Sequence, residues 1–182
     1  MRIKGNFLKD YVAVVNATPD LAWNRYLTPE DWKVVQSIIV PSMWYPVEVM
    51  AHIGRGIFEM RSGKNYSVVR AAGRARATLA YDETAKNFLL KNNPGEALKA
   101  YAMIAKRYVD ELNVEVLMIG SGRAEVLFHP IDDAPAWDLF REIQAGTMEK
   151  LVEMNGGLEP NAVFERREKD GREACLVVLT WK

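Results

Sequence analysis

The sequence has 182 residues, enough for one domain that buries roughly 70% of its unfolded surface. Apolar residues make up 49% and charged residues 26%, a composition typical of globular proteins that excludes a disordered tail, a collagen-like rod and a coiled-coil stalk. Lys and Arg number 24 and Asp and Glu also number 24, so the chain lacks the basic excess of a general nucleic-acid binder and we expect no nucleic acid as a partner.

Capping signals divide the first part of the chain, up to about residue 110, into helices. Thr18 and Thr28 each precede a proline, and Asn93 precedes Pro94. Each pair places a capping side chain before a proline, which suits the first helical position. The expected helices span residues 6–16, 19–26, 29–38, 46–60, 65–91 and 94–109.

The rest of the chain changes to the two-residue period of β-strands. Strands are expected at 113–119 and 123–129, joined by a glycine turn, and at 162–168 and 173–181, joined through the hairpin signal Asp-Gly. A helix over 133–154 separates the two hairpins. The expected fold class is therefore α+β, with N-terminal helices packed on a four-stranded antiparallel sheet, in the order ββαββ, and a crossing helix.

No linker-like segment interrupts the sequence, so we expect a single domain over residues 1–182. Its helical part is 1–110 and its ββαββ part is 111–182. Lys9 and Asp10 interrupt the short apolar run near the start, which therefore does not read as a signal peptide. No stretch is apolar enough to cross a bilayer. We expect a cytoplasmic protein without a membrane partner.

One face of the predicted helix 65–91 carries mostly small side chains. The members of this face are Val68, Ala71, Ala72, Ala75 and Leu79. A second backbone can approach such a face closely, either at a helix crossing within the chain or at the seam of a homodimer.

The segment 61–81 contains basic residues and no acidic residue. Its Arg70 and Arg74 are candidate contacts for a carboxylate or phosphate group on a ligand. A solvated helix face is the alternative. The acidic stripe on the helix 133–154 is a further candidate partner, within the chain or across a dimer.

Neither histidine predicts a metal or haem site. His52 shares its helix face with charged residues and His129 ends a strand, so both are expected in water. Cys175 alternates with apolar residues in the last strand and is expected to be a core thiol. A single cysteine also excludes an intrachain disulfide and a multi-thiolate zinc site. We expect no metal, no cofactor and no catalytic residue.

Large aromatic side chains at the predicted junctions indicate an apolar pocket. Trp44 and Tyr45 precede a helix-starting proline, where they suit either a pocket wall or a plug between helices and sheet. The expected ligand-binding residues are Trp44, Tyr45, Met50, Tyr101, Phe128, Trp137 and Phe140.

The order of several short motifs resembles an uncharacterised bacterial family known mainly as paralogues in myxobacteria. That family in turn looks like the superfamily of 4-vinyl-reductase domains and haem–nitric-oxide-binding domains. The motifs are Ser42–Pro46 after a Leu-Thr-Pro-Glu-Asp helix start, Ala72-Gly73-Arg74, Pro94, Ala105–Tyr108 and the closing strand from Glu173 to Trp181.

The resemblance implies the α+β fold and a domain that binds a small, largely apolar molecule. Its haem-binding relatives use a proximal histidine and a Tyr-x-Ser-x-Arg clamp on the haem propionates. Here Tyr66, Ser67 and Arg70 have the residue types but not that spacing, and His52 lies in no matching motif. The resemblance therefore implies no haem-binding residue in this chain.

The function expected from these observations is a non-catalytic sensory or regulatory domain that binds a small apolar ligand. A homodimer and a signalling protein are its expected partners. The alternatives are a small-molecule enzyme that uses Tyr81, Arg74 or Cys175, a haem-based gas sensor, and a structural dimerisation module with a filled core.

Overall fold

The computed structural model describes residues 1–79, 87, 89–131 and 136–182. The helices are α1 (Gly5–Ala17), the 3-10 turn η1 (Trp23–Arg25), α2 (Pro29–Val35), α3 (Val47–Met60), α4 (Tyr66–Leu79), α6 (Pro94–Ala105) and α7 (Trp137–Met154). The strands are β1 (Arg2–Lys4), β2 (Trp44–Pro46), β3 (Asn113–Gly120), β4 (Arg123–His129), β5 (Asn161–Lys169) and β6 (Arg172–Thr180).

The main sheet has the antiparallel order β3-β4-β6-β5. Gly122 and Gly171 sit at positive φ in the two hairpin turns, as the glycine signals in the sequence predict. The β3–β4 register shifts between Val116 and Met118, which leaves Leu117 as the extra residue of a β-bulge. The predicted ββαββ order and the α+β class are confirmed.

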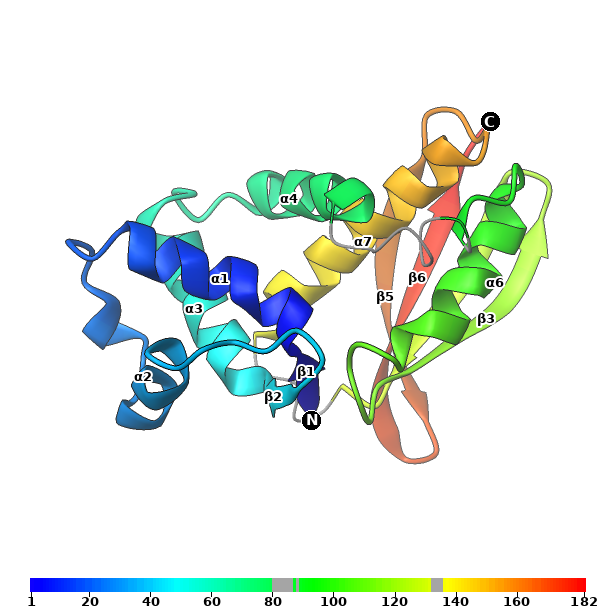
Figure 1. Ribbon diagram of the computed structural model, residues 1–182. Helices are drawn as coiled ribbons and strands as arrows, with labels where there is room; N and C mark the ends of the chain where they lie inside the picture. The colour runs from blue at the N-terminus through cyan, green and yellow to red at the C-terminus, as the bar shows by residue number, and fades with distance from the viewer. Residues whose placement is uncertain (80–86, 88, 132–135) are drawn as a thin grey trace.

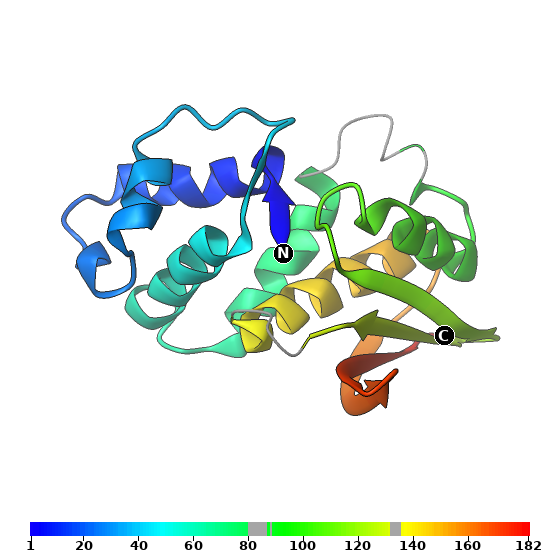
Figure 2. The ribbon, with the colours of Figure 1, turned by 90° about the horizontal axis from the view of Figure 1, so that it is seen from below.

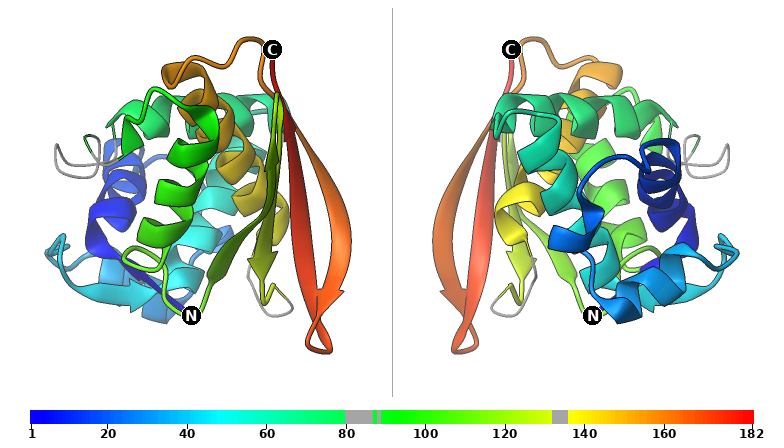
Figure 3. Two further views of the ribbon diagram at one scale, coloured as in Figure 1. Left: turned by 90° about the vertical axis from the view of Figure 1, so that its right-hand side faces the viewer. Right: turned by 90° about the vertical axis from the view of Figure 1, so that its left-hand side faces the viewer.

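Helices α6 and α7 cover one face of this sheet, while α1, α2 and α3 lie on the far side of α7 (Figure 1 and Figure 3). Helix α4 lies across α7 and reaches back toward α3 (Figure 2). The apolar core runs without a break from α1 and α3 through α6 and α7 to the inner face of the sheet.

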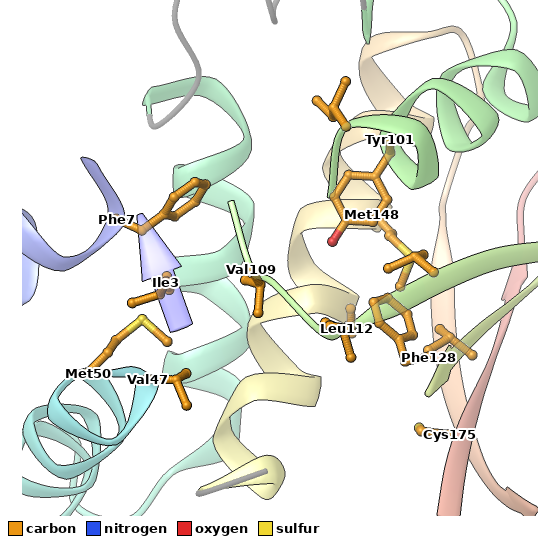
Figure 4. Close-up of a cluster of buried hydrophobic side chains, with 14 of the residues drawn as sticks. Ile3, Phe7, Val47, Met50, Tyr101, Val109, Leu112, Phe128, Met148 and Cys175 are labelled. Atoms are coloured by element: carbon orange, nitrogen blue, oxygen red, sulfur yellow. The ribbon is translucent and has the colours of Figure 1, made fainter. Parts of the chain in front are cut away.

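The middle of this core is drawn in Figure 4. Ile3 of β1 lies beside Met50 of α3 on one side, and Tyr101 of α6 points toward Met148 of α7 on the other. Ile3 is 2% exposed and Met148 is fully buried. The contact between Tyr101 and Met148 joins the helical part of the chain to the ββαββ part.

Three of the predicted helices are shorter in the structure. The predicted helix 19–26 is wrong: the chain turns so that the side chain of Trp23 is buried, its Nε1 donating to the Thr18 carbonyl at 2.9 Å, and only η1 remains. The helix predicted at 29–38 ends at Val35, and the one predicted at 94–109 ends at Ala105.

Parts of two other predicted helices lie outside the described residues. The helix predicted at 65–91 is α4 as far as residue 79, and its continuation over 80–86 and 88 falls outside them. Residues 90 and 91 are described and are not helical, so the predicted end of this helix is wrong. Residues 133–135 of the helix predicted at 133–154 also fall outside. The capping prediction at Thr28 is confirmed, because Thr28 and Asp31 form a reciprocal capping box.

Candidate functional site

A cavity of about 390 Å³ lies between helices α1, α3, α4 and α7. This volume falls within the range of roughly 300–1,000 Å³ that is typical of small-ligand sites. The residues that line it are Met1, Asp10, Tyr11, Val14, Val47, Met50, Ala51, Gly54, Ile57, Phe58, Ser62, Val68, Val69, Ala72, Ala75, Arg76, Leu112, Ala136, Trp137, Leu139, Phe140 and Ile143.

The lining is almost entirely apolar. The polar side chains in the lining are those of Asp10, Tyr11, Ser62 and Arg76, and Trp137 adds an indole N–H. In the described part of the chain, the lining includes no histidine or cysteine. A wall of this kind favours a ligand with a largely apolar body that a few polar groups orient.

Small residues of α4 form one wall of the cavity. Val68, Ala72 and Ala75 line it and are exposed, Val68 by 47%, so the cavity reaches the surface along this helix. The sequence predicts that another backbone packs closely against these residues. In the structure, the residue of α4 that approaches the backbone of α7 closely is Gly73. A Cβ on Gly73 would overlap the backbone carbonyl of Ile143 in α7.

The structure brings three of the seven predicted ligand-binding residues to the cavity. Met50 enters from α3, and Trp137 and Phe140 enter from the first turn of α7 with their ring centroids 5.2 Å apart. Tyr101 lines a smaller neighbouring cavity of about 50 Å³, which Met50 and Phe140 also line. Phe128 belongs to β4 and is buried in the main core, with its ring centroid 6.3 Å from that of Trp137.

Trp44 and Tyr45 lie outside the cavity lining, in the short strand β2 that pairs with β1. The Lys4 Nζ atom lies 4.2 Å from the centre of the Trp44 ring. The hydroxyl of Tyr45 accepts a hydrogen bond from the Val40 backbone N–H at 2.9 Å. These contacts tie β2 to β1 and to the loop that precedes it.

The predicted anion contacts Arg70 and Arg74 are occupied by carboxylates of α7. Arg70 Nε donates to Glu142 at 2.8 Å, and its Nη1 lies 3.3 Å from Glu149. Arg74 reaches Glu149 at 3.3 Å and also pairs with Glu153. The acidic stripe of the helix is therefore matched by the basic segment within one chain.

Glu149 also joins this cluster to the sheet. It is 5% exposed, and its Oε1 accepts a hydrogen bond from the Ala162 backbone N–H of β5 at 3.1 Å. Arg70 donates to the carbonyl of the same residue at 3.2 Å. The helix that walls the cavity is thus tied to an edge strand of the sheet.

A second cluster joins the three helices at one end of the cavity. Arg55 of α3 donates to both carboxylate oxygens of Asp138, at 2.6 and 3.0 Å, and the Tyr66 hydroxyl of α4 donates to Asp138 at 2.8 Å. Burial opposes ionisation of Asp138, but the hydrogen bonds from Arg55 and Tyr66 outweigh it and lower the pKa of that carboxyl. The hydrogen bond to Asp138 in turn raises the pKa of the Tyr66 phenol.

Both histidines are paired with carboxylates away from the cavity. The Nδ1 atom of His52 lies 2.8 Å from the buried Asp31, although its side chain is 38% exposed as the sequence suggests. His129 is not a surface residue: its side chain is 12% exposed, and its Nε2 lies 2.7 Å from Glu115. Pairing with Glu115 permits this burial, which strand periodicity alone does not reveal. Among the described residues no group of three potential ligands could hold a metal ion.

Cys175 is buried in β6, as predicted. Burial raises the pKa of its thiol to about 11, which keeps it protonated and unreactive near neutral pH. Tyr81, which the enzyme alternative also names, lies outside the described residues.

Sequence reasoning missed the walls supplied by α1 and α4. Tyr11 and Val14 come from α1, and Val69 and Arg76 come from α4. The small-residue face of α4 was the available signal, since small side chains leave space beside a helix wherever no other element packs against that face. Arg76 had no sequence signal that separated it from its neighbours Arg70 and Arg74.

Comparisons with known proteins show which solved structures share this fold. Neither a protein-family profile nor a curated protein sequence matches the chain. Solved structures do match, and a Cs H-NOX mutant with 4-cyano-L-phenylalanine at site 5 has a TM-score of 0.64 at 17% identity, covering 99% of this chain and 97% of that chain. An oxygen-binding H-NOX domain related to soluble guanylate cyclases has a TM-score of 0.60 at 15% identity, covering 99% and 95%.

A further H-NOX structure, which addresses the molecular mechanism of H-NOX activation, matches with a TM-score of 0.62 at 16% identity, covering 99% of this chain and 97% of that one. None of the described helices is long and apolar enough to cross a membrane. The predicted resemblance to haem–nitric-oxide-binding domains is confirmed at the level of fold: from end to end, the described chain has the α+β fold of the H-NOX domains.

Proposed function

We propose that this chain is a sensory or regulatory domain that binds a small, largely apolar molecule in the cavity between α1, α3, α4 and α7. The observation that carries the proposal is the cavity itself, with its volume of about 390 Å³ and its apolar lining. A domain of purely structural function gains nothing from such a space, because empty apolar volume costs stability.

Ligand binding can reach the rest of the molecule through α4 and α7. Trp137 and Leu139, which line the cavity, flank Asp138 in the cluster that joins α3, α4 and α7. Arg70 and Glu149 tie the same two helices to β5. A ligand that binds one arrangement of these helices more tightly shifts the population toward it, and a homodimer or a signalling partner would read that change.

The residues present do not fit a haem held in the manner of the structural relatives. Distortion of the haem or its porphyrin is named for two of the similar structures. A proximal histidine is the haem ligand that the resemblance implies, but neither histidine of this chain lines the cavity, and His52 and His129 pair with carboxylates elsewhere. We therefore assign no step to haem.

A direct test is the uptake of N-phenyl-1-naphthylamine, a neutral apolar dye that fluoresces on leaving water. The wild-type protein is expected to bind it with one-to-one stoichiometry. Ala51→Phe places a ring in the cavity from the buried face of α3 and is expected to abolish binding without lowering Tm. Ala71→Phe, on an exposed position of α4 outside the lining, is the control and should bind as the wild type does.

Equal dye binding by wild type and Ala51→Phe would contradict the proposed site. Native mass spectrometry and an absorption spectrum of the freshly purified protein separate the remaining alternatives. A bound mass of a few hundred daltons without a Soret band supports the proposal. A Soret band that survives dialysis overturns the proposal in favour of the haem-based gas sensor. The resemblance to the myxobacterial and 4-vinyl-reductase families would then no longer support a function for this chain.

A further inference from the structure

The guanidinium of Arg76 is a charged group at the cavity with no polar partner for two of its nitrogens. Its Nε and Nη2 atoms are buried, and neither has a hydrogen-bond acceptor in the described part of the chain. Arg76 lines both the large cavity and the smaller one beside it. Two buried, unsatisfied donors on one cation are costly, and such groups in native proteins call for a specific explanation.

The neighbouring arginines of α4 show what Arg76 lacks. Arg70 and Arg74, six and two residues earlier on the helix, each pair with two carboxylates of α7. Arg76 instead packs against rings of α1: its guanidinium carbon lies 4.0 Å from the centre of the Phe7 ring and 5.7 Å from that of Tyr11. These ring contacts hold the guanidinium plane in place, and they leave its buried Nε and Nη2 donors without a hydrogen-bond acceptor in the described part of the chain.

We propose that Arg76 binds the head group of the ligand and that the ligand is an apolar molecule with a single carboxylate, such as a fatty or aryl acid. This inference rests on the proposed function, because it gives the chemical class of the molecule that the cavity takes. A carboxylate accepts two parallel N–H bonds from a guanidinium and so satisfies both orphaned donors at once.

The rest of the lining restricts the ligand to one negative charge. Among the described residues, Arg76 is the one basic side chain that lines the large cavity, and Asp10 adds a negative charge to the same lining. A phosphate or a dicarboxylate would meet the negative charge of Asp10, and the amino group of Met1, which also lines the cavity, is already paired with Glu111 at 2.9 Å, so a monoanion fits better.

The place of Arg76 also gives the ligand an orientation. Tyr11, Met50, Phe140 and Ile143 line both cavities together with Arg76, so the head group lies near their shared wall. The apolar body then extends into the large cavity toward Ile57 and the exposed wall of α4.

The experiment compares decanoate with 1-decanol, which has the same apolar length and no charge, by displacement of N-phenyl-1-naphthylamine at neutral pH. The wild type is expected to bind decanoate at least tenfold more tightly than 1-decanol. Arg76→Met is expected to lose this preference while its affinity for 1-decanol stays within twofold, and Arg76→Lys to keep part of it. Arg61→Met, an exposed arginine outside the lining, is the matched control and should behave as the wild type does.

Stability gives a second readout that does not need a ligand. Because the guanidinium is unsatisfied without a ligand, Arg76→Met is expected to melt at the same temperature as the wild type or higher. Decanoate should raise the Tm of the wild type and leave that of Arg76→Met unchanged.

The outcomes separate this inference from the proposed function. Binding of the dye and of 1-decanol without any preference for decanoate overturns the inference and leaves the proposed function standing. A preference that persists in Arg76→Met also overturns it, since another group then holds the carboxylate. If the wild type binds none of the three probes, the proposed function itself fails. If Arg76→Met does not fold, the wild-type preference and the partial preference of Arg76→Lys still decide the matter.

Discussion

Gly73 of α4 and Gly146 of α7 bring the backbones of the two helices into direct contact. A Cβ on Gly146 would overlap the carbonyl oxygen of Arg70, and a Cβ on Gly73 would overlap that of Ile143. The Thr147 hydroxyl also lies 3.2 Å from the Gly73 carbonyl, as a hydrogen-bond donor. This crossing fixes the distance between two of the cavity walls.

Gly146→Ala is expected to destabilise the protein by roughly 1–3 kcal/mol, because an added methyl group must push the helices apart. The free energy of unfolding from urea titration measures this loss. Separation of α4 from α7 also changes the cavity, so the affinity for N-phenyl-1-naphthylamine should change in the same variant.

Gly54→Ala is the control for this substitution. Gly54 lies within α3 and lines the cavity, and its added Cβ would meet Tyr11 Cε1 at 3.5 Å, an ordinary contact distance. Alanine is the better helix former by about 1 kcal/mol, so stability should stay level or rise. Equal losses in the two variants would contradict the assignment of the close crossing to Gly146.

Asp138→Asn is expected to cost roughly 1–2 kcal/mol near neutral pH, because charged hydrogen bonds from Arg55 and Tyr66 are lost at a partly exposed site. The pKa of Asp138 is lowered in the folded protein, so its stabilisation is complete above the pKa of an unfolded aspartate, about 4. The stabilisation is lost as the pH falls through the lower folded value.

The difference in stability between wild type and Asp138→Asn should therefore shrink in acid, below about pH 4. Urea denaturation at several pH values measures it. Glu96→Gln is the control, since Glu96 and its partner Lys99 are each 55% exposed and their ion pair contributes little. A difference that stays constant down to the lowest pH would rule out this role for the Asp138 carboxylate.

Glu149→Ala is expected to cost roughly 3–5 kcal/mol, the loss typical of breaking a buried ion pair. It would leave Arg70 and Arg74 short of an acceptor and the Ala162 N–H without one. Glu153→Ala, which removes a 40% exposed carboxylate from the same helix, should cost less than about 1 kcal/mol. Thermal and urea denaturation of both variants would show whether burial separates these two glutamates.

The thiol of Cys175 should resist modification in the folded protein. With a pKa of about 11, only about one thiol in a thousand is ionised at pH 8, and the side chain is also buried. Reaction with a chromogenic disulfide is expected to be immediate in denaturant and to proceed in buffer only as fast as the protein opens. Rapid labelling in buffer would revive the enzyme alternative that uses this residue.

The main sheet could be predicted from the sequence because its strands are long enough to show the two-residue period and are joined by turns that contain glycine. Strands β1 and β2 could not be predicted, since three residues give no period, and their pairing depends on contacts between Ile3 and Tyr45 that are distant in sequence. The 19–26 error has the same origin: burial of Trp23 against Gly56, on another element, overrides a local capping signal.

The cavity was only partly readable. Met50, Trp137 and Phe140 were found because bulky apolar side chains at helix faces turn inward. The walls from α1 and α4 were missed because the position of an empty volume depends on how the helices pack and is not marked by any residue in the sequence. Arg76 was missed for a similar reason. It differs from Arg70 because no carboxylate in the described chain is bonded to its Nε or Nη2 atoms, and only the three-dimensional structure shows that difference.

The bulge at Leu117 lies in β3, one of the two open edges of the main sheet. That edge also exposes Met118 and Ile119, so a regular ladder there would offer apolar side chains and unpaired backbone groups to any other extended chain. An extra residue breaks the regular spacing of those groups. The opposite edge, β5, is rich in arginine and glutamate, which discourage the same addition by charge. The two borders of the sheet thus oppose unwanted strand addition by different means, one through irregular geometry and the other through electrostatics.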